Sequence, residues 1–568
     1  MTSRYNHMKK IIFLFLITYS LFRAVPVNAQ EKDLGNGIIE TVKPYKPVLS
    51  ESFKISDTPD ADTSSSNPSR LNYNVTPKKI ETNYEAGVIK AVRLKDEPIT
   101  KLYRSLLKLG IGNYSTYYGE LFVNSLRSKT GSLGLHLKHF SGSPGIPDAG
   151  VNTGFSENEA GVFGKYFFEN STFSGDVNFN RHFVHYYGFD VHDPVVFLIE
   201  TDDRQGFNNF SMNLGLQSNN ISKGDLDYDF HFRFNSISDL YDVTEPDVIV
   251  SGLFGKPVDE KYFSLFASFD FFKKSDSNFE RLYLDPLNHN LSRNIIHFQP
   301  QVKIDKDKYH LVLGVGLDME KNLGTILHLF PKAEISIPIA EHVLTAFAGV
   351  DGNVEKNNFK TITDENPFAI STVIPRNTIH KLILKGGLRG NFSNTISFSA
   401  SAGLDQMKDL QLFYNDTNSF LRSRFNVVYD NTDVFNVHAE ISYQKNEKLN
   451  ISLHVDQYSY STDLEYKAWH KPGSIISLAA KYNLHDKIIA DVSVFAHGVQ
   501  YAKGYDGNYI VAEKISGYMD LNLGVEYRYS KILSLYVHMN NLGFSRYYNW
   551  SQYPSERFNL LGGLTYAF

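Results

Sequence analysis

The stretch that decides the fold runs from Asp225 to Asn235 and reads Asp-Leu-Asp-Tyr-Asp-Phe-His-Phe-Arg-Phe-Asn. Every second residue is apolar, and the residues between them are polar or charged. Because successive side chains of a β-strand point to opposite faces, this pattern predicts a strand with one apolar and one hydrophilic face. A face of Asp, His and Arg needs water beside it. The alternation is therefore typical of a strand that separates lipid from an aqueous lumen.

The same alternation recurs along the chain, as in residues 519–529 and in the last strand, residues 558–568. Backbone groups inside hydrocarbon must all be hydrogen-bonded, and strands achieve this only when their sheet closes on itself. We therefore predict an all-β fold, a closed antiparallel transmembrane β-barrel. The terminal Phe568 resembles the signal by which the outer-membrane assembly machinery recognises its clients. That machinery and outer-membrane lipid are the expected partners.

The composition excludes several classes of protein. The 57 Lys and Arg against 62 Asp and Glu give a net charge of −5, without the long basic block of a nucleic-acid-binding protein. The absence of Cys excludes disulfides, thiolate metal sites and a lipid-modified cysteine. The 42 Phe and 35 Tyr in a chain with 21% charged residues suit alternating lipid-facing and water-facing positions. We expect no nucleic acid partner, no cofactor and no metal.

Residues 1–29 predict a secretory signal peptide. Lys9 and Lys10 precede the apolar run 11–17, and Val27-Asn28-Ala29 is typical of a cleavage site. The run is shorter than the ~20 apolar residues that cross a bilayer, so we expect cleavage rather than anchoring. Residues 30–102 are expected to form a mostly disordered periplasmic tail, because much of this segment is rich in Ser, Asp and Pro. This tail is the expected contact for periplasmic or outer-membrane partner proteins.

Residues 103–568 are expected to form the barrel. Short and long connections alternate, as they must where short turns are periplasmic and longer loops extracellular. Ten connections are tight, at residues 127–130, 169–171, 219–223, 257–260, 305–307, 338–341, 392–394, 446–448, 485–487 and 530–531. Nine are longer, at residues 143–156, 188–205, 236–246, 275–292, 355–376, 405–432, 461–470, 501–514 and 543–556.

Two further outer connections, near Tyr114 and Lys321, are short. Ten inner turns and eleven outer connections predict about 22 strands, within a range of about 20–24, with both ends in the periplasm. The connection 405–432 is the weakest assignment. In it, Leu410, Leu412 and residues 424–428 are interpreted as a small hairpin outside the membrane.

The closing segment resembles that of TonB-dependent receptors. Residues 535–543 end in Asn-Asn-Leu-Gly, Tyr547 and Tyr548 follow, and residues 553–557 read Tyr-Pro-Ser-Glu-Arg before the final strand. The resemblance implies a Gram-negative outer membrane, a barrel of this size and a role in transport. Receptors of that family carry a globular plug before the barrel. Residues 30–102 cannot build such a core, so we expect no plug domain.

A second resemblance covers the layout of the whole chain. Residues 42–47, Val-Lys-Pro-Tyr-Lys-Pro, and residues 468–472, Ala-Trp-His-Lys-Pro, are similar to plugless receptor-like barrels of the Bacteroidota. This resemblance implies a receptor-like barrel whose lumen is occluded by something other than a plug. The candidates are the tail of residues 30–102, an extracellular loop such as 355–376, or a partner protein.

Four charged residues are predicted to lie on the lumen wall: Asp225, Asp227, Asp229 and Arg233. The aspartates could select cations, or form a plain solvated wall balanced by Arg233. A speculative ligand-binding set comes from the aromatic outer loops: Trp469, His470, Tyr547, Tyr548 and Trp550. These rings could stack on a sugar or peptide, or belong to the aromatic girdle at the headgroup level.

Catalytic signals are missing from the sequence. It contains no Gly-x-Ser-x-Gly, no His-Glu-x-x-His and no phosphate-binding glycine loop, so we expect no enzyme. Two hypotheses for the function remain. The first is a receptor-like barrel that passes or binds a solute or polymer. The second is a structural subunit of a multi-protein envelope complex.

Overall fold

The computed structural model describes residues 103–126, 128–146, 149, 152–189, 204–219, 225–276, 290–321, 324–341, 343–417, 421–507 and 509–568. The predicted signal peptide, residues 1–29, and the predicted tail, residues 30–102, lie outside the described residues. Within them, no helix has the length and hydropathy needed to span a bilayer.

The described chain is almost entirely β-structure. Its barrel strands are β1 (Ser105–Gly112), β2 (Thr116–Asn124), β3 (Gly131–Gly142), β4 (Phe155–Phe167), β5 (Ser171–His185), β6 (Arg204–Ser218), β7 (Asp227–Asp239), β8 (Val243–Val258), β9 (Lys261–Asp276), β10 (Asn290–Lys306), β11 (Tyr309–Lys321), β12 (Thr325–Ala340), β13 (Leu344–Glu355), β14 (Thr378–Ser393), β15 (Ile396–Asn415), β16 (Phe425–Lys445), β17 (Leu449–Thr462), β18 (Ser474–Leu484), β19 (Ile488–His497), β22 (Tyr518–Arg528), β23 (Leu533–Asn540) and β26 (Asn559–Ala567).

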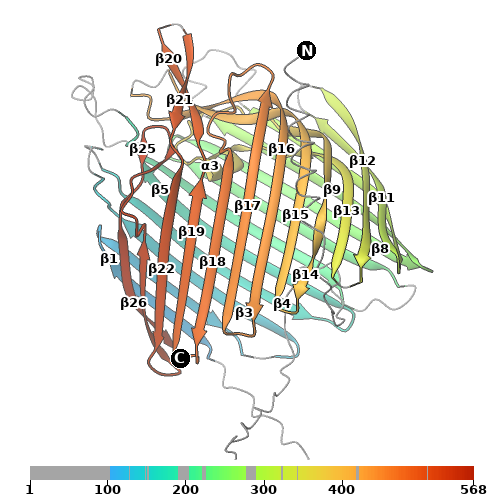
Figure 1. Cartoon of the computed structure of the whole chain (residues 1–568), viewed down its shortest axis with the longest axis horizontal. Helices are drawn as coiled ribbons and strands as arrows, with labels where there is room; N and C mark the ends of the chain where they lie inside the picture. Colours follow the sequence, from blue (N-terminus) through green and yellow to red (C-terminus); the bar gives the residue numbers. More distant parts are fainter. Residues whose placement is uncertain are drawn as a thin grey trace, which may run out of the picture. The chain divides into compact units, whose positions relative to one another are not determined.

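In the described parts of the connections lie four short strands and one helix. They are α3 (Phe359–Glu365), β20 (Gln500–Asp506), β21 (Tyr509–Ile515), β24 (Tyr548–Trp550) and β25 (Tyr553–Pro554). β20 pairs with β21, and β24 with β25, as two hairpins separate from the main sheet. In Figure 1 the β20–β21 hairpin rises from the same end of the barrel at which α3 lies.

The main sheet has 22 strands, each paired antiparallel with its neighbours in the chain, and it closes on itself. Closure joins β1 to β26, from Leu106 opposite Ala567 to Gly112 opposite Leu561. The final residue takes part, because Phe568 N–H donates to the Ser105 carbonyl at 3.0 Å and the Ser105 N–H donates back at 3.0 Å. The predicted closed barrel of 22 strands is confirmed.

The two faces of the wall differ as the alternation predicts. On β7, Phe230 is 40% exposed, and on β16 Phe435 and Val437 are 41% and 42% exposed. These side chains point outward, where they meet acyl chains. Residues of the opposite register, such as His438 and Asp456, hydrogen-bond to each other at 2.9 Å across β16 and β17 on the lumen face. A closed wall with an apolar exterior is the architecture of a transmembrane barrel.

The ten predicted tight turns all fall between paired strands, but two predicted long loops are wrong. Residues 236–246 were expected to form a loop, yet β7 and β8 continue through them and leave only residues 240–242 between the strands. Residues 405–432 are mostly strand as well, because β15 has 20 residues and β16 has 21. The hairpin expected inside that segment is the continuous outer part of β15 and β16.

A tyrosine covers the closing seam on the lumen side. Tyr536 on β23 is only 3% exposed, and its hydroxyl donates to the Leu109 carbonyl on β1 at 3.0 Å. The ring thereby crosses β26 to reach β1. Space for it comes from Gly563, where an added Cβ would lie 2.5 Å from the Tyr536 ring and 2.0 Å from the Leu109 oxygen.

We predict that Gly563→Val destabilises the closed barrel, because the new side chain overlaps both the tyrosine and the backbone of β1. Overpacking of this kind costs about 1–3 kcal/mol. The matched control is Gly562→Val, where an added Cβ has no neighbour closer than 3.9 Å. The midpoint of the heat-induced mobility shift on denaturing gels should fall for Gly563→Val and stay unchanged for Gly562→Val. Equal midpoints would contradict the packing described for the seam.

Candidate functional site

The outer ends of several strands extend beyond the bilayer. A barrel strand crosses the membrane with about 9–11 residues, whereas β8 and β9 have 16 each and β15 has 20. The tight turns mark the periplasmic end, so the additional residues lie on the side of the long connections. The extended strands form a raised rim, and this rim carries the candidate site.

One apolar cluster joins three separate parts of this rim. Its members are Phe207, Ile237 and Val243 on β6, β7 and β8, Phe413 and Phe425 on β15 and β16, Tyr553 in the last outer connection, and Phe359, Ile362, Ala369 and Val373 from the connection between β13 and β14. All of them are buried, at 0–6% exposure. The three rim sectors are β6–β8, β15–β16 and the last outer connection, between β23 and β26. Six strands of the sheet lie between the first and second sectors, four between the second and third, and five between the third and first.

That separation has a geometric consequence. Strands lie about 4.8 Å apart, so roughly 25–35 Å of wall lies between neighbouring sectors. A lumen of 22 strands is too wide for wall side chains alone to fill. A single contiguous cluster that includes all three sectors must therefore cross the mouth. Residues 356–377, which we call the α3 loop, supply the part that crosses.

The α3 loop begins with a short helix that is capped at its first residue. The side chain of Asn358 accepts a hydrogen bond from the Thr361 N–H at 2.9 Å, and the Thr361 hydroxyl is 2.9 Å from the Asn358 N–H, a reciprocal capping box. Two N–H groups of the first turn remain to be satisfied. Both donate to the carboxylate of Glu245 on β8, from Phe359 at 2.9 Å and Lys360 at 3.2 Å.

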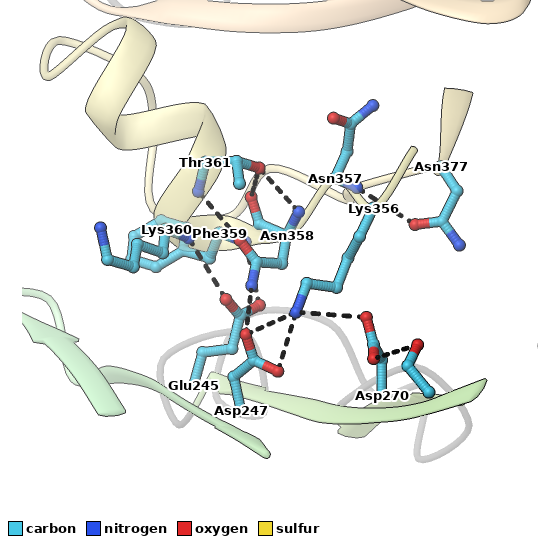
Figure 2. Close-up of polar contacts among 11 residues, drawn as sticks. Glu245, Asp247, Asp270, Lys356, Asn357, Asn358, Phe359, Lys360, Thr361 and Asn377 are labelled. Carbon is cyan, nitrogen blue, oxygen red and sulfur yellow. Dashed lines mark hydrogen bonds and ion pairs between the residues drawn. The ribbon is translucent and has the colours of Figure 1, made fainter. Parts of the chain in front are cut away.

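Figure 2 shows these contacts together with the ion pairs that fix the start of the loop to the wall. Lys356 Nζ lies 2.8 Å from Asp247 on β8 and 3.9 Å from Asp270 on β9. Both aspartates are buried, at 6% and 7% exposure. Asn358 also donates to Asp247, at 3.3 Å. The beginning of the α3 loop is thus bound to the wall by several charge-assisted hydrogen bonds.

The return segment of the α3 loop is held by buried polar groups of the same rim sector. Lys274 on β9, 6% exposed, donates to the carbonyls of Ser371 and Val373 at 2.7 and 2.8 Å. Gln205 on β6 is fully buried and donates to the Ser371 hydroxyl at 3.1 Å. These contacts come from side chains of the wall, so the strands themselves determine the path of the loop.

On the opposite side, the α3 loop meets the connection between β17 and β18, residues 463–473. Glu365 at the end of α3 accepts from Lys471 Nζ at 2.7 Å and from Gln411 on β15 at 3.0 Å. The tip of β15–β16 and the last outer connection, residues 541–558, complete the arrangement. We refer to the α3 loop, residues 463–473 and residues 541–558 together as the cap.

His470 links two parts of the cap. Its Nδ1–H donates to the Phe413 carbonyl at 3.0 Å, and its Nε2 accepts from the Ser551 N–H at 3.2 Å. Complete burial lowers the pKa of His470 to about 4, so the ring is neutral at pH 7 and only this tautomer satisfies both partners. The residue has a φ of 56°, in the left-handed region that His tolerates better than most side chains.

A cavity of about 630 Å³ lies between the cap and the wall formed by β15 to β22. Its lining includes Tyr458, Tyr460, His497 and Tyr518 from the strands and Trp550 from the last outer connection. The size is that of a small-molecule site. This cavity and the α3 loop above the rim are the two candidate functional features of the molecule.

The predicted lumen-wall residues lie on or beside β7. Asp227, Asp229 and Arg233 share the register opposite to the lipid-facing Phe230, and Asp225 precedes the strand. Asp227 accepts from the Tyr262 hydroxyl at 2.6 Å, and Asp229 pairs with His231 at 2.9 Å. The structure therefore gives two of the three aspartates partners within the wall.

The structure brings together most of the residues predicted to bind a ligand. His470 and Trp550 line the cavity, with their ring centroids 5.2 Å apart. Tyr547 stacks on the cavity residue Tyr518 at 3.9 Å. Trp469 is fully buried in a cluster with Leu412 and Ala468, and Tyr548 is 39% exposed in the β24–β25 hairpin; neither lines the cavity.

No sequence pattern predicted the residues that anchor the α3 loop. Glu245, Asp247, Lys274 and Lys356 are ordinary members of alternating strands or loops, and nothing in their local pattern marks them. One signal was available. Asn358 and Thr361 have the spacing of a capping box and could have indicated a helix start inside residues 355–376.

Comparisons with known proteins find the barrel but no family. No protein-family model and no curated protein matches the sequence. Among solved structures, a variant of the ferric enterobactin receptor PfeA from Pseudomonas aeruginosa is 12% identical, with a TM-score of 0.60 over 82% of this chain and 80% of that chain. The siderophore receptor PirA from Acinetobacter baumannii is 10% identical, with a TM-score of 0.61 over 83% and 81%.

The FrpB iron transporter from Neisseria meningitidis (F3-3 variant) is also 10% identical, with a TM-score of 0.63 over 83% of this chain and 82% of that chain. Identities this low show a shared fold only. The shared fold is the closed barrel of 22 antiparallel strands. With its apolar exterior, such a barrel is an outer-membrane protein.

We predict that Lys356→Met loosens the α3 loop. The substitution leaves Asp247 and Asp270 buried without their cation, which typically costs several kcal/mol. Amide hydrogen exchange of residues 359–365 should accelerate by at least about tenfold. Lys360→Met is the matched control, since Lys360 pairs with Asp364 on the exposed side of α3, and it should change exchange by less than about threefold. Equal acceleration in both variants would contradict the anchoring role of Lys356.

We predict that acid weakens the contact between residues 463–473 and the rest of the cap. The pKa of His470 is lowered from 6.5 to about 4. Its contribution is therefore complete above about pH 6.5 and is lost as the pH falls toward and through about 4, by roughly 3 kcal/mol in total. Exchange protection of this loop should fall over that window and lose this dependence in His470→Asn. An unchanged profile in the variant would assign the pH dependence to another group.

Proposed function

We propose that the chain is a receptor-like outer-membrane transporter whose outer mouth is closed by its own cap, and that it passes or binds a solute there. The observation that supports this most strongly is the apolar cluster that includes three rim sectors and the α3 loop. A barrel of 22 strands without a closure admits solutes freely. The α3 loop is one of the three occluding elements that the sequence suggested.

The resting state is closed because the cap is well packed. Phe359 and Ile362 are fully buried, and Val373 is 1% exposed. Each such side chain contributes about 1.5–3 kcal/mol when it leaves water. Opening the α3 loop exposes all three and separates the buried ion pairs at Asp247. The cap therefore opens only when a ligand or partner binds the open state more tightly than the closed state, by a free energy comparable to the cost of opening.

Two finer parts of the proposal come from the resemblances in the sequence. We propose that the barrel is of the plugless Bacteroidota type, with the cap performing the closure that a plug performs in TonB-dependent receptors. The solved relatives are an enterobactin receptor, a siderophore receptor and an iron transporter by their descriptions. The chain shares their barrel, and this likeness supports the proposed transport role without catalysis.

A second candidate function is a platform for other envelope proteins. It is favoured by large apolar side chains that are exposed at the outer end: Leu464 at 87%, Tyr466 at 70% and Tyr509 at 79%. Exposed apolar groups at the tips of loops are typical of protein contacts. Purification in mild detergent followed by mass spectrometry separates the two functions. A stable set of co-purifying proteins favours the platform, and a single species favours the transporter.

Conductance in planar lipid bilayers tests the closure directly. The intact protein should show low conductance. Replacement of residues 359–373 by a Gly/Ser segment of equal length removes Phe359, Ile362, Ala369 and Val373 from the cluster, and it should produce a large, steady conductance. A large permanent conductance of the intact protein would contradict the proposal. A low conductance of both proteins would assign the closure to a segment other than the α3 loop.

A further inference from the structure

The cavity beneath the cap combines flat aromatic surfaces from several elements. Tyr458 and Tyr460 on β17 lie side by side, with centroids 5.9 Å apart and planes at 21°. His497 and Tyr518 also line the cavity, stacked at 5.0 Å and 8°, and Tyr518 is held from outside the lining by Tyr547, which stacks on it at 3.9 Å and 5°. Ring faces of this kind bind flat ligands through offset stacking.

The charges of the lining cancel. Glu365 and Lys471 are the only ionised pair among the cavity residues that the structure describes, and they bind each other at 2.7 Å. His470 is neutral because burial lowers its pKa to about 4. Apart from the imidazole of His497, the lining therefore offers an anionic ligand no free cation, and it offers a cationic ligand no free carboxylate. Burial of an unpaired charge in such a site is costly, so the lining favours an uncharged ligand.

The rest of the lining is mainly aliphatic. Met407, Leu410, Val434 and Ile475 contribute to the wall. Besides the residues discussed above, the polar groups are the imidazole of His497, the amides of Gln500 and Asn549 and the tyrosine hydroxyls. A sugar, with a hydroxyl on nearly every carbon, would leave several of them against aliphatic groups without a partner. A ring with an apolar body and one or two polar substituents satisfies the lining better.

The position of the cavity connects it to the cap. Glu365 belongs to α3, Lys471 to residues 463–473 and Trp550 to residues 541–558. His470 also belongs to residues 463–473, whereas the rings of Tyr458, Tyr460, His497 and Tyr518 belong to the wall. A ligand in the cavity thus contacts all three segments of the cap at once. It lies against the Glu365–Lys471 ion pair that joins the first two.

We propose that this cavity is a binding site for an uncharged, predominantly apolar ring compound with a hydroxyl or amide substituent, held between the tyrosines of the wall and Trp550 of the cap. The inference rests on the proposed function, because it names the class of solute that a capped barrel receives. It assigns the recognition to the residues under the cap rather than to the lumen wall of β7.

Intrinsic fluorescence tests the proposal, since the chain has only 2 Trp and one of them lines the cavity. The probe is 4-bromobenzyl alcohol, an uncharged ring compound whose bromine quenches tryptophan emission. Quenching of the full chain in lipid nanodiscs should saturate, with a Kd on the order of 0.1–1 mM for a probe of this size. Trp550→Phe should remove the saturable component and leave only linear collisional quenching.

A pair of neighbouring variants controls for folding and for partition into lipid. Ile475→Phe adds volume to the cavity lining on β18, whereas Ile476→Phe adds the same volume to the lipid face of the same strand, where Ile476 is 38% exposed. Both should keep the heat-induced gel shift of the folded barrel. Ile475→Phe should weaken the saturable quenching by roughly tenfold or more, and Ile476→Phe should leave it within about twofold.

Three outcomes would overturn the inference. They are quenching without saturation in the wild-type chain, equal binding of the anion 4-bromobenzoate, and displacement of the probe by maltose at similar concentrations. The first outcome would show that the probe has no specific site. The second would show that the cavity does not select against anions, and the third would show that it binds sugars. Each leaves the bilayer conductance unaffected, so failure of this inference is distinguishable from failure of the proposed closure.

Discussion

The structure depends on the requirement that no backbone hydrogen bond stay open inside the membrane. A sheet meets it only by pairing its first strand with its last, here β1 with β26 along their length. Closure at 22 strands then sets a circumference too large for wall side chains to fill. The mouth of the barrel is therefore wide, and the outer connections of this chain form the cap that lies across it.

The cap combines two kinds of interaction with different roles. Apolar packing of Phe359, Ile362 and Val373 supplies most of the stabilisation, because it removes large side chains from water. The buried groups Glu245 and Lys274 specify where the α3 loop lies, because each would be left unpaired in any other position. A cap built in this way has a unique closed position and a substantial cost of opening. Any ligand or partner that opens it must bind the open state more tightly by a similar amount.

The membrane part of the fold was predictable from the sequence, and the part outside the membrane was much less so. Within the bilayer, apolar and polar residues must alternate along each strand, so the pattern of a segment such as Asp225–Asn235 predicts which side chains face lipid. The ten tight turns predict the number of strands. Outside the bilayer, strands need not alternate or end at a fixed length. The sequence pattern therefore predicts loops at residues 236–246 and 405–432, where the ends of β7, β8, β15 and β16 build the rim. Trp550 and His470 were predicted from their residue types alone. Their proximity depends on contacts between distant segments that no local pattern encodes.

The measurement that tests the cap most directly is thiol cross-linking in native membranes, because the chain has no cysteine of its own. Glu365 and Lys471 form the 2.7 Å contact between α3 and residues 463–473. A Glu365→Cys/Lys471→Cys chain should therefore form an internal cross-link with a short bifunctional thiol reagent, whereas the two single-cysteine chains should not. Efficient modification of both cysteines without an internal cross-link would show that the α3 loop does not lie across the mouth, and it would contradict the account given above.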